Sequence, residues 1–185
     1  GGYYGKSHAY CVTVASDGTP YVAGLSRDNV IPVVPGVDFI IELDAFTGDV
    51  IKELLIDSLI EDGEVWDMIA VTSPQPGHMV LGGAFKRTDA VEYNLLTGCI
   101  YTSDDFGETW SHVDIGHEIS PVITLAYDPL DPKVIYAGTG YDGSGSGIWK
   151  TIDGGTTWEF SGLFGREVPG IAVDPHDPRT VYAVD

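Results

Sequence analysis

A turn of the form Asp-Pro-x-Asp-Pro occurs twice in this chain, and each time it separates two apolar stretches. The first turn begins at Asp128 and the second at Asp174, 46 residues apart. The stretches around the first turn, Val122 to Tyr127 and Lys133 to Gly138, are rich in β-branched and aromatic residues, which favour strands. Two short strands joined by a proline-containing turn predict an antiparallel hairpin. Because the hairpin recurs at a fixed spacing, we expect an array of similar units.

A second motif, [ST]-x-D-x-G-x-T-W, also occurs twice, with its tryptophans 48 residues apart. In such a turn the Asp carboxylate can accept hydrogen bonds from its own backbone, Gly supplies a positive φ, and Trp leaves the turn into a hydrophobic slot. We therefore predict structural rather than catalytic roles for its residues. They are Ser103, Asp105, Gly107, Thr109 and Trp110 in the first copy, and Thr151, Asp153, Gly155, Thr157 and Trp158 in the second.

Looser copies of both motifs extend the repeat toward the start of the chain, at 10–24, 39–54 and 66–83. We predict an all-β fold in which residues 1–185 form a single partial β-propeller of about three and a half four-stranded antiparallel blades. Blades of four strands at a period of roughly 40 to 50 residues are typical of propellers, whereas a sandwich would not repeat its turn chemistry. The predicted blades are roughly 8–56, 65–115 and 121–161, with a half blade at 168–185.

With these two motifs the chain resembles the Asp-box, or BNR repeat, β-propellers. This group includes sialidases, xyloglucanase-type glycoside hydrolases, the sortilin luminal domain and a photosystem assembly factor. The resemblance implies that the Asp-boxes lie on the face away from the ligand site. We expect an extracellular or periplasmic protein. Family members close rings of six or more blades. We therefore expect this chain to be a piece of a longer protein or one subunit of an oligomeric ring, and its end at Asp185, within a blade, favours the piece.

The charge of the chain restricts its partners. It carries 28 acidic and 9 basic residues, a net charge of -19, which repels phosphate backbones and anionic lipid, so we expect no nucleic-acid partner. No stretch approaches the roughly 18 apolar residues that a membrane span needs. Cys11 and Cys99 could form a disulfide or remain buried thiols, and neither has metal-ligand spacing.

In a propeller, the loops between second and third strands and those between blades share the ligand face, where function concentrates. Here these loops are 26–37, 57–64, 84–98, 116–120, 139–146 and 162–167. Our ligand-face candidates are Arg27, Arg87, Tyr141, Asp142 and Arg166.

Two catalytic interpretations and one metal interpretation follow from these loops. Xyloglucanases of the family place a catalytic Asp just after a second strand, and Asp142 occupies a comparable loop, although its neighbours do not match the motif. The three arginines could bind a carboxylate as in sialidases, but the arginine motif near the start of sialidases is absent. The oxygen-rich stretch Tyr141-Asp-Gly-Ser-Gly-Ser-Gly147 could hold Ca²⁺ or serve as a flexible connection. We expect no other cofactor.

Three functions remain open at this level. The first is a binding or structural scaffold whose partner is a polysaccharide or a protein. The second is part of a glycoside hydrolase, which would need two carboxylates facing each other across a cleft. The third is a subunit of an extracellular assembly joined through blade edges. Whether the protein is an enzyme depends on loop residues rather than on the fold.

Overall fold

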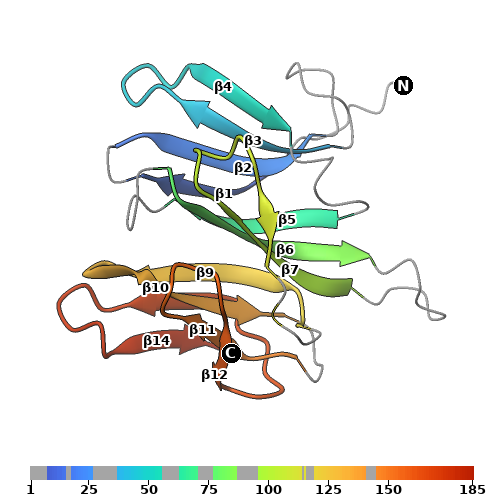
Figure 1. Cartoon of the computed structure of the whole chain (residues 1–185), viewed down its shortest axis with the longest axis vertical. Helices are drawn as coiled ribbons and strands as arrows, with labels where there is room; N and C mark the ends of the chain where they lie inside the picture. Colours follow the sequence, from blue (N-terminus) through green and yellow to red (C-terminus); the bar gives the residue numbers. More distant parts are fainter. Residues whose placement is uncertain are drawn as a thin grey trace.

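The computed structural model describes residues 8–15, 18–26, 37–55, 63–70, 77–86, 96–113, 115, 119–140 and 145–185. Within these residues all regular structure is β, which confirms the all-β prediction, and no helix there is long and apolar enough to cross a membrane. The strands form three four-stranded sheets and one two-stranded sheet, each antiparallel and each ordered as in the sequence (Figure 1).

The sheets follow one another along the chain. The first contains β1 (His8–Val14), β2 (Pro20–Ser26), β3 (Val37–Leu43) and β4 (Val50–Leu55). The second contains β5 (Gly63–Ala70), β6 (Met79–Lys86), β7 (Leu96–Ser103) and β8 (Ser111–His112). The third contains β9 (Val122–Asp128), β10 (Asp131–Thr139), β11 (Ile148–Thr151) and β12 (Glu159–Gly162). The last contains β13 (Gly170–Val173) and β14 (Val181–Val184). That residues 1–185 form a single domain stays a prediction.

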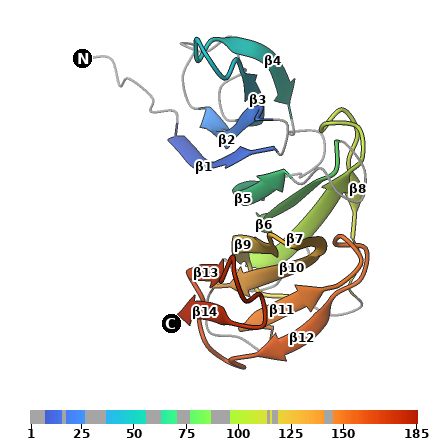
Figure 2. The ribbon, with the colours of Figure 1, turned by 90° about the vertical axis from the view of Figure 1, so that its left-hand side faces the viewer.

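The sheets fan out around a common axis. The first strands of neighbouring sheets pack together, β1 against β5, β5 against β9, and β9 against β13. Figure 2 shows these first strands on one side of the molecule, with β4, β8 and β12 toward the outside. Successive four-stranded sheets arranged in this way are the geometry of propeller blades.

Because every sheet is an antiparallel meander, its connections alternate between two ends of the molecule. We call the end with the β9–β10 and β11–β12 turns the corner end. The opposite end carries the β8–β9, β10–β11 and β12–β13 connections, and we call it the loop end. The two [ST]-x-D-x-G-x-T-W motifs form the β7–β8 and β11–β12 turns and therefore lie at the corner end.

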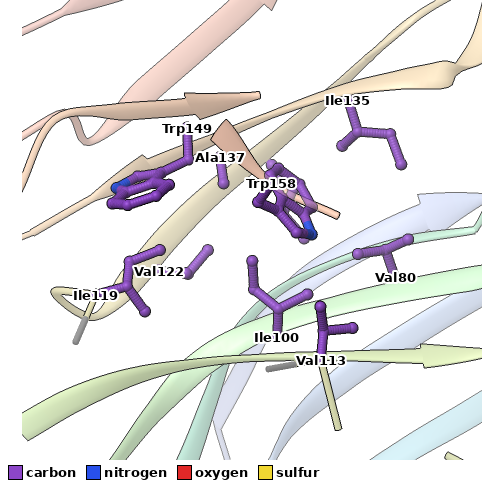
Figure 3. Close-up of a cluster of buried hydrophobic side chains, with 10 residues drawn as sticks. Val80, Ile100, Val113, Ile119, Val122, Ile135, Ala137, Trp149 and Trp158 are labelled. Atoms are coloured by element: carbon purple, nitrogen blue, oxygen red, sulfur yellow. The ribbon is translucent and has the colours of Figure 1, made fainter. Parts of the chain in front are cut away.

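Two hydrophobic clusters hold neighbouring sheets together. Side chains alternate along β6, so Met79 and Leu81 join a cluster with Tyr21 and Ile40 of the first sheet, while Val80 faces the third sheet. Cys11 and Cys99 belong to the first cluster as thiols, with no disulfide between them. Figure 3 shows the second cluster, whose labelled members are Val80, Ile100, Val113, Ile119, Val122, Ile135, Ala137, Trp149 and Trp158.

Candidate functional site

The first corner closes around one carboxylate. Asp105 Oδ1 accepts hydrogen bonds from the backbone N–H of Thr109 and the hydroxyl of Ser103, each at 2.8 Å, and Oδ2 accepts from the Thr109 hydroxyl at 2.5 Å. Ser103 Oγ in turn accepts from the N–H of Gly107, and the Trp110 indole donates to the Gly107 carbonyl at 2.9 Å. Both carboxylate oxygens are thus occupied within the turn.

The second corner repeats this network atom for atom. Asp153 Oδ1 accepts from the N–H of Thr157 at 2.9 Å and from the Thr151 hydroxyl at 2.7 Å, and Oδ2 accepts from the Thr157 hydroxyl at 2.6 Å. The Gly155 N–H donates to Thr151 Oγ1, and the Trp158 indole donates to the Gly155 carbonyl at 2.9 Å. The ten residues singled out from the sequence therefore form two matching turns, each built around one Asp.

The hydrogen bonds keep both carboxylates ionised. The Thr109 hydroxyl and N–H lower the pKa of Asp105 below its usual value. Burial raises the pKa of Asp153, but the bonds from Thr157 and Thr151 outweigh it, so the net shift is also downward. A carboxylate stabilised in this way is a weak base and a weak nucleophile. This arrangement suits a structural role, which remains our interpretation of the corners.

At the loop end, a buried hydrogen-bond network ties three connections of the third sheet together. Thr139 at the end of β10 is fully buried, and its hydroxyl accepts from the Gly147 N–H at 2.8 Å. Its carbonyl accepts from the N–H of Val168, two residues before β13, at 2.9 Å. The Trp149 indole donates to the Gly145 carbonyl at 3.1 Å, and the Gly140 N–H donates to the Pro121 carbonyl at 2.8 Å. The described parts of these connections are fixed by the scaffold.

An aromatic series leads from this network to the surface. Trp149 and Phe160 meet edge to face with ring centroids 5.7 Å apart, and Phe160 and Phe164 do so at 5.9 Å. The exposed fraction rises from 6% for Trp149 to 43% for Phe160 and 69% for Phe164. We call Phe160 and Phe164 the aromatic pair. Sequence reasoning missed it, although the apolar residues within the glycine-bounded loop Gly162-Leu-Phe-Gly165 were a usable signal.

The predicted ligand-face residues are described only in part. Arg27, Arg87, Tyr141 and Asp142 lie outside the described residues, so their predicted roles stay predictions. Arg166 lies at the loop end, in the β12–β13 connection, and its Nη1 is 3.1 Å from Oδ2 of Asp185. Within the part of the chain that the structure describes, no three His, Cys, Asp or Glu side chains converge as a metal site would require.

Comparison with known proteins finds partial sequence similarity to xyloglucanases. No family model matches it. It is 30% identical to a xyloglucanase of Hypocrea jecorina over 123 residues, which are 60% of this chain and 14% of that protein. It is 32% identical to the xyloglucanase Xgh74A of Acetivibrio thermocellus over 95 residues, which are 48% of this chain and 10% of that protein. The match thus spans only a small part of each curated relative.

Two solved structures resemble this chain in their fold. The GH74 xyloglucanase of Xanthomonas campestris superposes with a TM-score of 0.55 and 17% identity, over 83% of this chain and 23% of that one. A Hadza microbial sialidase superposes with a TM-score of 0.50 and 18% identity, over 85% of this chain and 33% of that one. At these identities the likeness concerns the fold alone. Together with the fan of four-stranded sheets, it confirms that the chain is a portion of a β-propeller.

Proposed function

We propose that this chain is part of an extracellular β-propeller that binds a neutral, xyloglucan-like polysaccharide at its loop end. The sequence identity of 30 to 32% to two xyloglucanases carries the proposal, because it points to the class of polymer. The net charge of -19 supports a neutral polymer, since an anionic one would be repelled.

The geometry supports binding at the loop end rather than at the corner end. The carboxylates of Asp105 and Asp153 lie at the corner end, and both oxygens of each accept hydrogen bonds within their own turn. The loop end of the third sheet instead offers connections fixed by the Thr139 network and an exposed aromatic pair. A preorganised surface loses little conformational entropy on binding, which favours affinity.

A second function, part of a glycoside hydrolase, is favoured by the names of both curated relatives, which are xyloglucanases. It requires two carboxylates about 5 to 10 Å apart across the bound chain. Asp142 is our candidate for one of them. The same loop, 141–147, is our proposed position for a Ca²⁺ ion, with Asp142 as its carboxylate ligand.

Further blades are a proposed partner of this portion. The first sheet exposes Val12 and Val14 on its outer face, and the last sheet exposes Tyr182 and Val184. Apolar faces at both ends of an array are normally covered by a neighbouring repeat or by a polar cap. We propose that blades of the same longer chain, or of neighbouring subunits, cover them.

Affinity electrophoresis tests the binding function directly. The purified chain is run through native gels that contain xyloglucan, an unsubstituted neutral β-glucan, or polygalacturonate. We expect retardation by xyloglucan and none by polygalacturonate, with the dissociation constant then measured by calorimetry on xyloglucan oligosaccharides. Release of reducing ends from the same polymer would favour the hydrolase. Migration unchanged by every neutral polysaccharide would refute the binding function.

A further inference from the structure

We propose that Phe160 and Phe164 form a stacking subsite for one pyranose ring of a neutral polysaccharide. This subsite rests on the proposed function and assigns it to two side chains. Phe160 is on β12 of the third sheet, and Phe164 is in the β12–β13 connection at the loop end. The hydrophobic C–H face of a β-linked pyranose can pack on an exposed aromatic ring much as apolar groups do in a core.

The orientation of the aromatic pair is fixed by the side chain on which it packs. Phe160 lies opposite Trp149 in the β11–β12 register, and the two rings meet at an interplanar angle of 84°. Trp149 is itself held by the hydrogen bond from its indole to the Gly145 carbonyl. Phe164 then meets Phe160 at 76°. Phe164 packs on Phe160, and Phe160 packs on Trp149, so the side chain of Phe164 is already ordered before a ligand binds. The conformational entropy lost on binding is therefore smaller.

The backbone that carries Phe164 is also constrained. Leu163 adopts a left-handed φ of 56°, which is uncommon for a residue other than glycine, and Gly165 follows with a φ of 74°. The Gly165 N–H donates to the Ser146 carbonyl and the Arg166 N–H donates to the Leu163 carbonyl, each at 3.1 Å. Strained backbone that the surroundings hold in place is often found at ligand sites. Here Phe164, which lies between these two residues, is 69% exposed.

The charge of the chain favours a neutral sugar as the occupant, since a net charge of -19 repels anionic polymers. Arg166, two positions after Phe164, is already paired with Asp185. Glu167 follows the pair in the sequence and is exposed, whereas Glu159 lies opposite Lys150 and, as the neighbour of Phe160 on β12, points to the other face of the sheet.

The test compares Phe164→Ala, Phe164→Leu and Phe164→Trp with Phe46→Ala as the matched control. Phe46 is 99% exposed in the β3–β4 turn at the corner end, so its removal also deletes an exposed phenyl ring. We expect Phe164→Ala to weaken binding of xyloglucan oligosaccharides about tenfold, which is the loss of affinity expected when one such stacking contact is removed. Phe164→Leu should recover little of the loss, Phe164→Trp should recover most, and Phe46→Ala should bind as the original chain does. Near-ultraviolet circular dichroism checks that each variant is folded.

The outcomes separate the subsite from the proposed function. If the original chain binds xyloglucan and Phe164→Ala binds equally well, the subsite is overturned while the binding function stands. If the original chain binds no neutral polysaccharide, the binding function itself fails. Sedimentation of the unliganded chain provides the remaining check, since self-association that disappears in Phe164→Ala would assign the pair to a protein interface and overturn the subsite.

Discussion

His78 Nε2 lies 2.6 Å from the carbonyl oxygen of Gly154, so a side chain of the second sheet reaches the corner of the third. The other ring nitrogen, Nδ1, lies 2.6 Å from Oδ1 of Asp104 in the first corner. A backbone carbonyl can only accept, and therefore Nε2 carries a hydrogen. The imidazole, 7% exposed, thus links the two corners.

Replacing His78 by Ala should destabilise the chain by about 1 to 3 kcal/mol, because the buried Gly154 carbonyl loses its donor. His176→Ala is the control, since the side chain of His176 is 93% exposed. The free energy of unfolding in urea, followed by tryptophan fluorescence, measures both variants. Equal stability of the two variants would show that the link between the corners contributes nothing.

The corners should also make stability depend on pH. Hydrogen bonds lower the pKa of Asp105 and of Asp153 below the ordinary value of 3.8, so the folded chain binds protons at these sites less readily than the unfolded chain does. Their contribution is therefore complete above the unfolded pKa, and it is lost as the pH falls below about 4 through the lowered values.

Asp153→Asn tests this pH dependence. The variant should be less stable than the original chain at pH 7, and the difference should shrink as the pH falls toward 2 to 3. Because Asp153 is largely exposed, we expect a difference of only about 1 kcal/mol. Urea unfolding between pH 2.5 and 7 measures it. A difference that stays constant across this range would contradict the proposed origin of the stability.

The sequence predicted the turns well because their chemistry is local. The oxygens of Asp153 bond to Thr151 and Thr157, all within one short motif, so residue types and spacing were sufficient. The links between sheets were not accessible in the same way. His78 and Gly154 are 76 positions apart, and their contact depends on how neighbouring sheets are stacked. The aromatic pair was missed because ring contacts and exposed fractions follow from the three-dimensional packing around Trp149, which residue types and spacing do not report.

Close packing of β10 against the segment before β13 gives a test of the fan geometry. A Cβ atom on Gly138 would lie 2.5 Å from the Val168 carbonyl oxygen and 2.6 Å from Cγ2 of Thr124. Because the nearer atom is backbone, Gly138→Ala should cost about 1 to 3 kcal/mol. Gly162→Ala, on β12, is the matched control, since a Cβ atom on Gly162 would meet nothing within 4 Å. Thermal unfolding should rank Gly138→Ala well below the control, and equal melting temperatures would contradict the packing of β10 against the segment before β13.

The two corner tryptophans separate the energy of burial from that of the hydrogen bond. Trp110 and Trp158 each donate from the indole to the equivalent glycine carbonyl at 2.9 Å, so truncation of either one removes the same bond. Trp158 is buried in the second cluster, whereas Trp110 is only partly buried at the edge of the first. We therefore expect Trp158→Ala to cost about 3 to 5 kcal/mol and Trp110→Ala clearly less. Urea unfolding followed by far-ultraviolet circular dichroism measures both without relying on the deleted fluorophore. Equal losses would mean that the hydrogen bond, rather than packing against the preceding sheet, dominates the contribution of each corner.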